Sequence, residues 1–267
     1  MKKAVKYVAI LFVLAGIACG GVAFLQYYNE KTAGEEYEVL REQVVKPEIP
    51  EEVPDVSETE TVQPEVEAVE CPIDFVALKE ENPDIYAWIQ IPGTKIDYPI
   101  LCRQGDNAFY LDHSYTGKKK AEGAIFTEDL NSQDFTDPNT VIYGHNMKNG
   151  SMFRDLHKYS DKAFFEDYQK VIIYMPEQML EYHIFAAYTY DDRHILKSFN
   201  FMNTDVFSTY LQEILDKRKN MRDNIEDDVV LSEESRLITL STCTSNADKR
   251  FLVQAVLKET KPIKEEK

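Results

Sequence analysis

Cys243 stands where a chain could present a nucleophile. It ends the run TLSTC (residues 239–243), in which an apolar stretch with strand character gives way to a polar loop. The end of a strand is a rigid place from which to present a side chain at a surface. Most free cysteines are small buried hydrophobes, however, so Cys243 alone does not decide between a reactive thiol and a packed one.

A histidine occupies a similar position upstream. His145 follows Val141–Tyr143 and Gly144, where another strand pattern breaks into a loop. Gly144 has no side chain, which lets another backbone segment approach the imidazole closely. No two histidines have HxxxH or HExxH spacing, which argues against a metal site. The remaining histidines lack this setting and are predicted to be surface or packing residues: His113, His157, His183 and His194.

Arg250 begins the next predicted strand, seven residues after Cys243. A hairpin between the two strands would bring its guanidinium close to the thiol, although a solvated charge at a turn would explain Arg250 equally well.

Together, Cys243, His145 and Arg250 indicate a catalytic site more strongly than each residue does alone. A thiol with a pKa of about 8.5 needs a base or a cation to become a nucleophile. An imidazole can also protonate a leaving amine, and an arginine can stabilise an oxyanion, so the set predicts acyl transfer.

The elements that must position these residues are mostly short strands. Gly, Pro, Asn and Asp separate them, which is typical of a β-rich fold. Eight strands with inserted helices predict a closed β-barrel, because closure removes exposed edges. The predicted strands are Ala87–Ile91, Lys95–Leu101, Glu122–Thr127, Thr140–Tyr143, Val171–Met175, Met179–Tyr190, Arg236–Thr242 and Arg250–Lys258. The predicted helices are Ile73–Asn82, Met152–Tyr159, Lys162–Gln169 and the long Thr204–Arg222.

Composition excludes several classes of protein. The 267 residues are 43% hydrophobic and 12% aromatic, enough for a sizeable core, so the chain is not disordered throughout. A net charge of -17 argues against a nucleic-acid binder, which needs a basic surface. The four cysteines show no CxxC spacing, so we expect neither a disulfide scaffold nor a structural zinc site, and Cys71 and Cys102 are predicted to be free.

The N-terminus has the pattern of a membrane anchor. Lysines at 2, 3 and 6 precede the uncharged run Tyr7–Leu25, whose 19 residues would span about 28 Å as a helix. The flanking lysines favour a cytoplasmic N-terminus. A cleaved signal peptide would have a shorter core and an A-x-A site, and the apolar run continues past Cys19, which argues against a lipid anchor there. We therefore assign residues 1–28 to a cytoplasmic tip and an uncleaved transmembrane anchor.

A strongly acidic segment follows the anchor. Residues 29–70 carry 14 acidic and 3 basic side chains and four prolines. Such a segment repels itself and resists compaction, so residues 29–71 are predicted to form an extended linker. The folded domain is predicted over residues 72–260, with a charged tail at 261–267. The domain would then lie outside the cell on a stalk.

Several motifs, in order, resemble those of class B sortases. The TLSTC run with Arg250 and the upstream run GHNMKNGSMF (144–153) carry the resemblance most clearly. Others are NPDIYAWI (82–89), IPGT (91–94) and DYP (97–99). The likeness covers about residues 72–258. It implies an eight-stranded β-barrel cysteine transpeptidase on the surface of a Gram-positive bacterium.

By this resemblance, Cys243 attacks a Thr–Gly-type bond in the sorting signal of a secreted protein, His145 serves as acid and base, and Arg250 holds the substrate carbonyl or oxyanion. An amino group of a peptidoglycan precursor, of the lipid II type, then resolves the thioester. The resemblance also implies that Asn107, Leu111 and Ser241 line the substrate groove and that the backbone N–H of Thr244 is a second oxyanion donor. No cofactor and no metal dependence are expected.

Three other functions fit the same residues. In a pilin-polymerising sortase the acceptor would be a lysine of another protein, but its usual lid loop and C-terminal membrane segment are not evident. A surface cysteine hydrolase would use water as the acceptor. In a tethered binding module, Cys243 would be merely buried and would resist alkylation in the folded state.

Overall fold

The barrel is closed by eight strands, as predicted. The computed structural model describes residues 20–21, 24, 34–46, 68–220 and 223–264. Hydrogen bonding gives the strand order β5-β1-β2-β3-β4-β8-β9-β6, and β6 pairs with β5 to close the ring. The barrel strands are β1 (Ile85–Gln90), β2 (Asp97–Leu101), β3 (Ile125–Thr127), β4 (Asn139–Tyr143), β5 (Lys170–Tyr174), β6 (Gln178–Asp191), β8 (Leu237–Cys243) and β9 (Lys249–Pro262). A ninth, two-residue strand that the sequence did not predict, β7 (Asn224–Ile225), pairs with Ala186 and Ala187 of β6.

The strand that carries Cys243 lies in the interior of the sheet. Strand β8 is buried from Leu237 to Thr242 and becomes exposed at Cys243. It lies between β4, to which it is parallel, and β9, to which it is antiparallel. A strand that is hydrogen-bonded on both sides is held firmly along its length, so the end of β8 is a rigid platform for the thiol.

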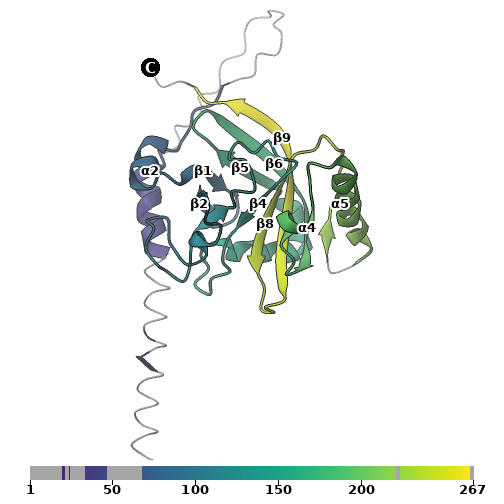
Figure 1. Cartoon of the computed structure of the whole chain (residues 1–267), viewed down its shortest axis with the longest axis horizontal. Coiled ribbons are helices and arrows are strands. Elements are labelled where there is room, and N and C mark those ends of the chain that lie inside the picture. The colour runs from purple at the N-terminus through teal and green to yellow at the C-terminus, as the bar shows by residue number, and fades with distance from the viewer. Residues whose placement is uncertain (1–19, 22–23, 25–33, 47–67, 221–222, 265–267) are drawn as a thin grey trace, which may run out of the picture.

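Helices flank the barrel on two sides (Figure 1). Helix α2 (Phe75–Glu81) lies on one side, where Asp74 caps it by accepting a hydrogen bond from the backbone of Ala77. Helices α4 (Ile195–Ser198) and α5 (Thr204–Asp216) lie on the other side. Helix α5 buries one apolar face, as its 3.6-residue period predicts. That face consists of Phe207, Tyr210, Leu211 and Ile214.

The shorter helical segments differ in type from the prediction. Residues Phe153–Ser160 form 3-10 helix (η2) rather than α-helix, and α3 follows at Lys162–Asp167. The 3-10 turn η1 (Phe109–Leu111) was not predicted. The single helix predicted over Thr204–Arg222 consists of α5, which ends at Asp216, followed by the 3-10 turn η3 (Lys217–Lys219). Segments of three residues leave too short a pattern for hydrophobic periodicity to detect.

The predicted linker contains a packed helix. Residues 34–44 are helical, and Tyr37, Leu40 and Val44 are at most 4% exposed against the barrel. The prediction of an extended chain is therefore wrong for this part of residues 29–71. These apolar side chains recur at a spacing of three and four, which is one face of a helix. The high density of acidic residues concealed that spacing.

The predicted transmembrane segment, Tyr7–Leu25, lies outside the described residues except for Gly20, Gly21 and Phe24. Within the part of the chain that the structure describes, no helix is long and apolar enough to cross a membrane.

Candidate active site

The ends of β4 and β8 bring His145 and Cys243 together. The two strands are parallel neighbours, and their register pairs Tyr143 with Ser241. Continued by two residues, the same register sets His145 beside Cys243. The Gly144 backbone N–H donates to the Ser241 carbonyl at 3.1 Å, which extends the ladder to this point. Two residues almost a hundred positions apart thus become neighbours through strand pairing alone.

The β8–β9 hairpin supplies the arginine. Arg250 is the partner of Cys243 across the antiparallel ladder, so the two side chains project from the same face of the sheet. The guanidinium Nη1 donates to the Ala247 carbonyl at 2.8 Å and to the Lys249 carbonyl at 3.0 Å. Because a guanidinium has five N–H donors, these bonds orient it and leave donors for a substrate oxygen.

The contacts of His145 and Cys243 favour charge separation between them. His145 Nε2 lies 2.7 Å from the Leu111 carbonyl, to which it can donate, leaving Nδ1 for the thiol. Hydrogen bonding with His145 is the main influence that lowers the pKa of the Cys243 thiol; partial burial opposes it, and the charge of Arg250 adds to it. The same hydrogen bond raises the pKa of His145, against the opposing effect of burial. A thiolate beside an imidazolium is the activated form of a cysteine nucleophile.

Two residues that were not predicted to belong to the site contact the backbone of Cys243. The Cys243 carbonyl lies 3.0 Å from Asn146 Nδ2 and 3.0 Å from His157 Nε2. Burial lowers the pKa of His157, and its ring stacks on Phe251 with 4.9 Å between centroids. The prediction that His157 is a surface or packing residue is therefore incomplete. No spacing in the sequence predicts that His157 lies near Cys243, because the two residues meet only through the placement of η2.

A glycine is needed at position 144 because neighbouring side chains, and not a backbone segment, fill the space where a Cβ would lie. A Cβ at this position would lie 2.5 Å from Ile125 Cδ1 and 2.7 Å from the Phe153 ring. From the sequence we expected another backbone segment to make this close approach. The two apolar side chains fill the space directly under the turn that carries His145.

The predicted substrate residues lie in different settings. Leu111 is half exposed, and its carbonyl is the partner of His145. Ser241 is buried at 6% exposure, two residues before Cys243 on the same face of β8. Thr244 follows Cys243 directly, and its hydroxyl donates to the Asn246 carbonyl at 2.9 Å. Asn107 is held by Asp129, to whose Oδ1 it donates at 2.6 Å and from whose N–H it accepts at 2.8 Å.

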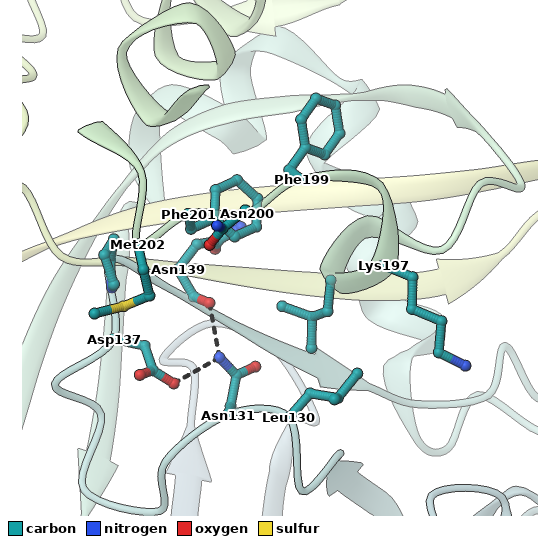
Figure 2. Close-up of a pocket in the computed structure, with 11 residues that line it drawn as sticks. Leu130, Asn131, Asp137, Asn139, Lys197, Phe199, Asn200, Phe201 and Met202 are labelled. Atoms are coloured by element: carbon teal, nitrogen blue, oxygen red, sulfur yellow. Dashed lines mark hydrogen bonds between the residues drawn. The ribbon is translucent and has the colours of Figure 1, made fainter. Parts of the chain in front are cut away.

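The described residues form no metal site, and the cavity in Figure 2 is lined by none of the candidate residues. No group of three or more His, Cys, Asp or Glu side chains among them could hold a metal ion. A cavity of about 290 Å3 lies between the β3–β4 connection and the segment around α4 (Figure 2). In it, Asn131 donates to Asp137 and to the Asn139 carbonyl, and none of the candidate site residues lines it.

Comparison with known proteins identifies the family. The model of the sortase domain matches residues 89–258. Sortase B of Listeria monocytogenes is 40% identical over 172 residues, which cover 64% of this chain and 67% of the relative. The chain is a class B sortase. Sortases are cysteine transpeptidases of the cell wall, and the resemblance in the sequence motifs is thereby confirmed.

Further relatives extend the likeness. Sortase B of Staphylococcus aureus is 29% identical over 261 residues, covering 96% of this sortase and 97% of the relative. The crystal structure of Clostridium perfringens sortase B matches with a TM-score of 0.63 at 30% identity, covering 70% of this chain and all of that one. The predicted mainly β, eight-stranded sortase-like barrel is confirmed.

Proposed function

We propose that this sortase cleaves the C-terminal sorting signal of secreted proteins through a thioester on Cys243. The observation that supports this most directly is the placement of His145 beside Cys243 on parallel strands, with Arg250 as its antiparallel partner. In the first half-reaction the Cys243 thiolate attacks the carbonyl carbon of a Thr–Gly-type bond and forms a C–S bond. The carbonyl oxygen becomes an oxyanion next to the Arg250 guanidinium and the Thr244 backbone N–H.

Collapse of this intermediate needs an acid. The C–N bond breaks, and the imidazolium of His145 gives its proton to the departing amine, leaving a thioester and a neutral imidazole. In the second half-reaction an amino group of a peptidoglycan precursor attacks the thioester carbonyl. His145 takes the proton of that amine as the new amide forms, and the Cys243 thiolate leaves. The pair thus returns to its starting charges.

We further propose that the substrate groove runs past Leu111 and Ser241 toward Cys243, with Asn107 at its edge. Leu111 offers an exposed apolar side chain while its carbonyl holds the histidine. Asn107 is fixed on Asp129, which supports a role in orienting a peptide.

The proposal includes a single-pass anchor with the N-terminus in the cytoplasm and the barrel outside. The uncharged run Tyr7–Leu25 and the lysines before it support this orientation. Fractionation of cells that make the full chain should leave it in the membrane pellet after a wash at high salt. Release by salt would contradict the anchor.

Incubation of the full chain with a panel of sorting-signal peptides, with and without an amine acceptor, tests the reaction. Mass spectrometry should find cleavage at one Thr–Gly-type bond and ligation of the amine, both absent from Cys243→Ala. Cleavage without incorporation of any amine would point to a hydrolase. Incorporation of a protein lysine, but not of a peptidoglycan-type amine, would point to pilin polymerisation.

A further inference from the structure

Glu122 is a buried carboxyl group that the proposed reaction leaves without a role. It is 2% exposed, and its Oε1 has no hydrogen-bond partner within the described residues. The ammonium group of Lys120 lies 3.9 Å from that oxygen. Burying a carboxyl group with so little compensation is costly, which suggests that its charge acts on something nearby.

The fold places Glu122 next to His145. Strands β3 and β4 pair Phe126 with Tyr143, and the same register continued by two residues sets Ala124 opposite His145. Glu122 precedes Ala124 by two residues, in the turn that leads into β3 through Gly123.

A second contact leads from Glu122 to the same imidazole. A Cβ on Gly123 would lie 2.9 Å from the Leu111 carbonyl oxygen, so the backbone beside Glu122 packs against the group that receives the His145 hydrogen bond at 2.7 Å. Gly123 has φ +57, the left-handed region that favours glycine, which allows this close approach.

We propose that Glu122 is a positioning residue whose buried carboxylate stabilises the imidazolium form of His145. The inference rests on the proposed function, in which the Cys243–His145 ion pair is the reactive form. A negative charge nearer to the imidazolium than to the thiolate favours the ion pair over the neutral thiol and imidazole. Arg250 acts on the thiolate and Glu122 on the imidazolium, so the two charges reinforce the same separation.

The charges around Glu122 come from three elements. Lys120 and His145 face it with positive charge, and Glu36 of the helix at 34–44 faces it with negative charge. Burial raises the pKa of Glu122, while its own backbone N–H, Lys120 and His145 lower it. Glu122 in turn helps to raise the pKa of His145, alongside the hydrogen bond with Cys243.

The helix at 34–44 closes this region from water. Lys120 Nζ lies 2.7 Å from Glu36 Oε2, so that carboxylate holds the ammonium in place. The hydroxyl of Tyr37 donates to the Gly123 carbonyl at 3.3 Å. The exclusion of water strengthens the electrostatic effect of Glu122 on His145.

The test is the rate of alkylation of Cys243 by iodoacetamide across pH, measured in the full chain and in Glu122→Gln. We expect the rate near neutral pH to fall about three- to tenfold, the equivalent of half to one pKa unit. At alkaline pH, where the thiolate no longer depends on an imidazolium, the rates should converge. Glu122→Asp retains the charge and should restore part of the neutral-pH rate.

Glu128→Gln is the matched control, because Glu128 is also a buried glutamate held by a histidine, His194, at 2.8 Å. It should leave the profile unchanged. Superimposable profiles for wild type and Glu122→Gln would overturn the inference, and so would an equal loss at every pH, which indicates a purely structural role. If Cys243 of the wild type reacts no faster than an ordinary thiol, the proposed function itself fails.

Discussion

Opposing effects set the reactivity of Cys243. Partial burial alone would keep the thiol protonated, and the hydrogen bond with His145 together with the charge of Arg250 outweighs it. The pKa of Cys243 is lowered while that of His145 is raised, and both shifts increase the fraction of molecules in which thiolate and imidazolium coexist. Activity should pass through a maximum with pH, because protonation removes the thiolate on the acidic side and deprotonation removes the imidazolium on the alkaline side.

Replacement of His145 by Gln should shift the reactivity of Cys243 to higher pH. The main influence that lowers the thiol pKa is then lost, and the thiolate forms only near the ordinary value of about 8.5. Alkylation rates measured across pH give the midpoint. His183→Gln is the control, since His183 lies on β6 and contacts Glu226, just after β7, at 2.9 Å. A midpoint that does not move in His145→Gln would contradict the assignment.

Arg250→Ala should lower kcat/KM for a sorting-signal peptide by about 100- to 1000-fold, the usual cost of removing an oxyanion donor. Arg250→Lys should recover only part of this, because a lysine keeps the charge but not the planar set of donors. The neighbouring, exposed Lys249 offers the control variant Lys249→Ala. Peptide cleavage by Arg250→Ala at the wild-type rate would remove Arg250 from the mechanism.

Among single residues, the sequence was enough to predict those whose type and position at a strand end indicate their chemistry. Cys243, His145 and Arg250 each stand at the boundary of a strand pattern, and the structure brings them together. His157 could not be found in this way, because its role depends on how the η2 segment folds back onto Cys243. Asn146 contacts the Cys243 carbonyl from the loop after β4, and its residue type alone does not indicate that role.

At the scale of the elements, the stability of the turn after β4, which carries His145, depends on the side chains packed beneath Gly144. Gly144→Ala should destabilise the protein by about 1–3 kcal/mol, because the new methyl group collides with Ile125 and Phe153. It should also lower activity by displacing His145. Thermal or denaturant unfolding measures the first effect and peptide cleavage the second.

Gly34→Ala is the control for this variant. A Cβ at Gly34 meets nothing within 4 Å, and the residue lies in a helix, where alanine is favoured. Equal stability of wild type and Gly144→Ala would show that the space under the turn is not as tightly filled as the structure indicates.

The strands of the barrel were predictable because each carries several β-forming residues between turn signals. Strand β6 was foreseen within about a residue at each end, whereas β7, with two residues, carries no pattern of its own. The 3-10 conformation of η2 was not foreseen either, since its apolar spacing fits an α-helix equally well.

At the scale of the whole molecule, the helix at 34–44 packs part of the acidic N-terminal segment against the catalytic domain. Leu40→Ala should cost about 2–5 kcal/mol of unfolding free energy, because Leu40 is 3% exposed in the main core. The adjacent Val39 is 52% exposed, and Val39→Ala should change stability little. Equal effects of the two variants in denaturant titrations would mean that the helix does not pack on the barrel in solution.

The overall organisation was only partly readable from the sequence. The negative charge and the prolines of residues 29–70 led to the prediction of an extended chain. The helical spacing of Tyr37, Leu40 and Val44 was too weak a pattern to change that prediction. The packing of a short helix depends on a complementary surface on the barrel, and local sequence does not reveal that surface. The acidic residues of the helix point elsewhere, except Glu36, which binds Lys120 beside the site.

The most direct test of the central claim is the intact mass of the full chain during reaction with a cleavable sorting-signal peptide. We predict an adduct equal to the N-terminal acyl fragment, mapped to Cys243 by digestion, which disappears when an amine acceptor is added. Release of the C-terminal peptide fragment should accompany its formation, and Cys243→Ala should show neither. Cleavage that proceeds without any adduct, or that persists in Cys243→Ala, would contradict thioester catalysis by this cysteine.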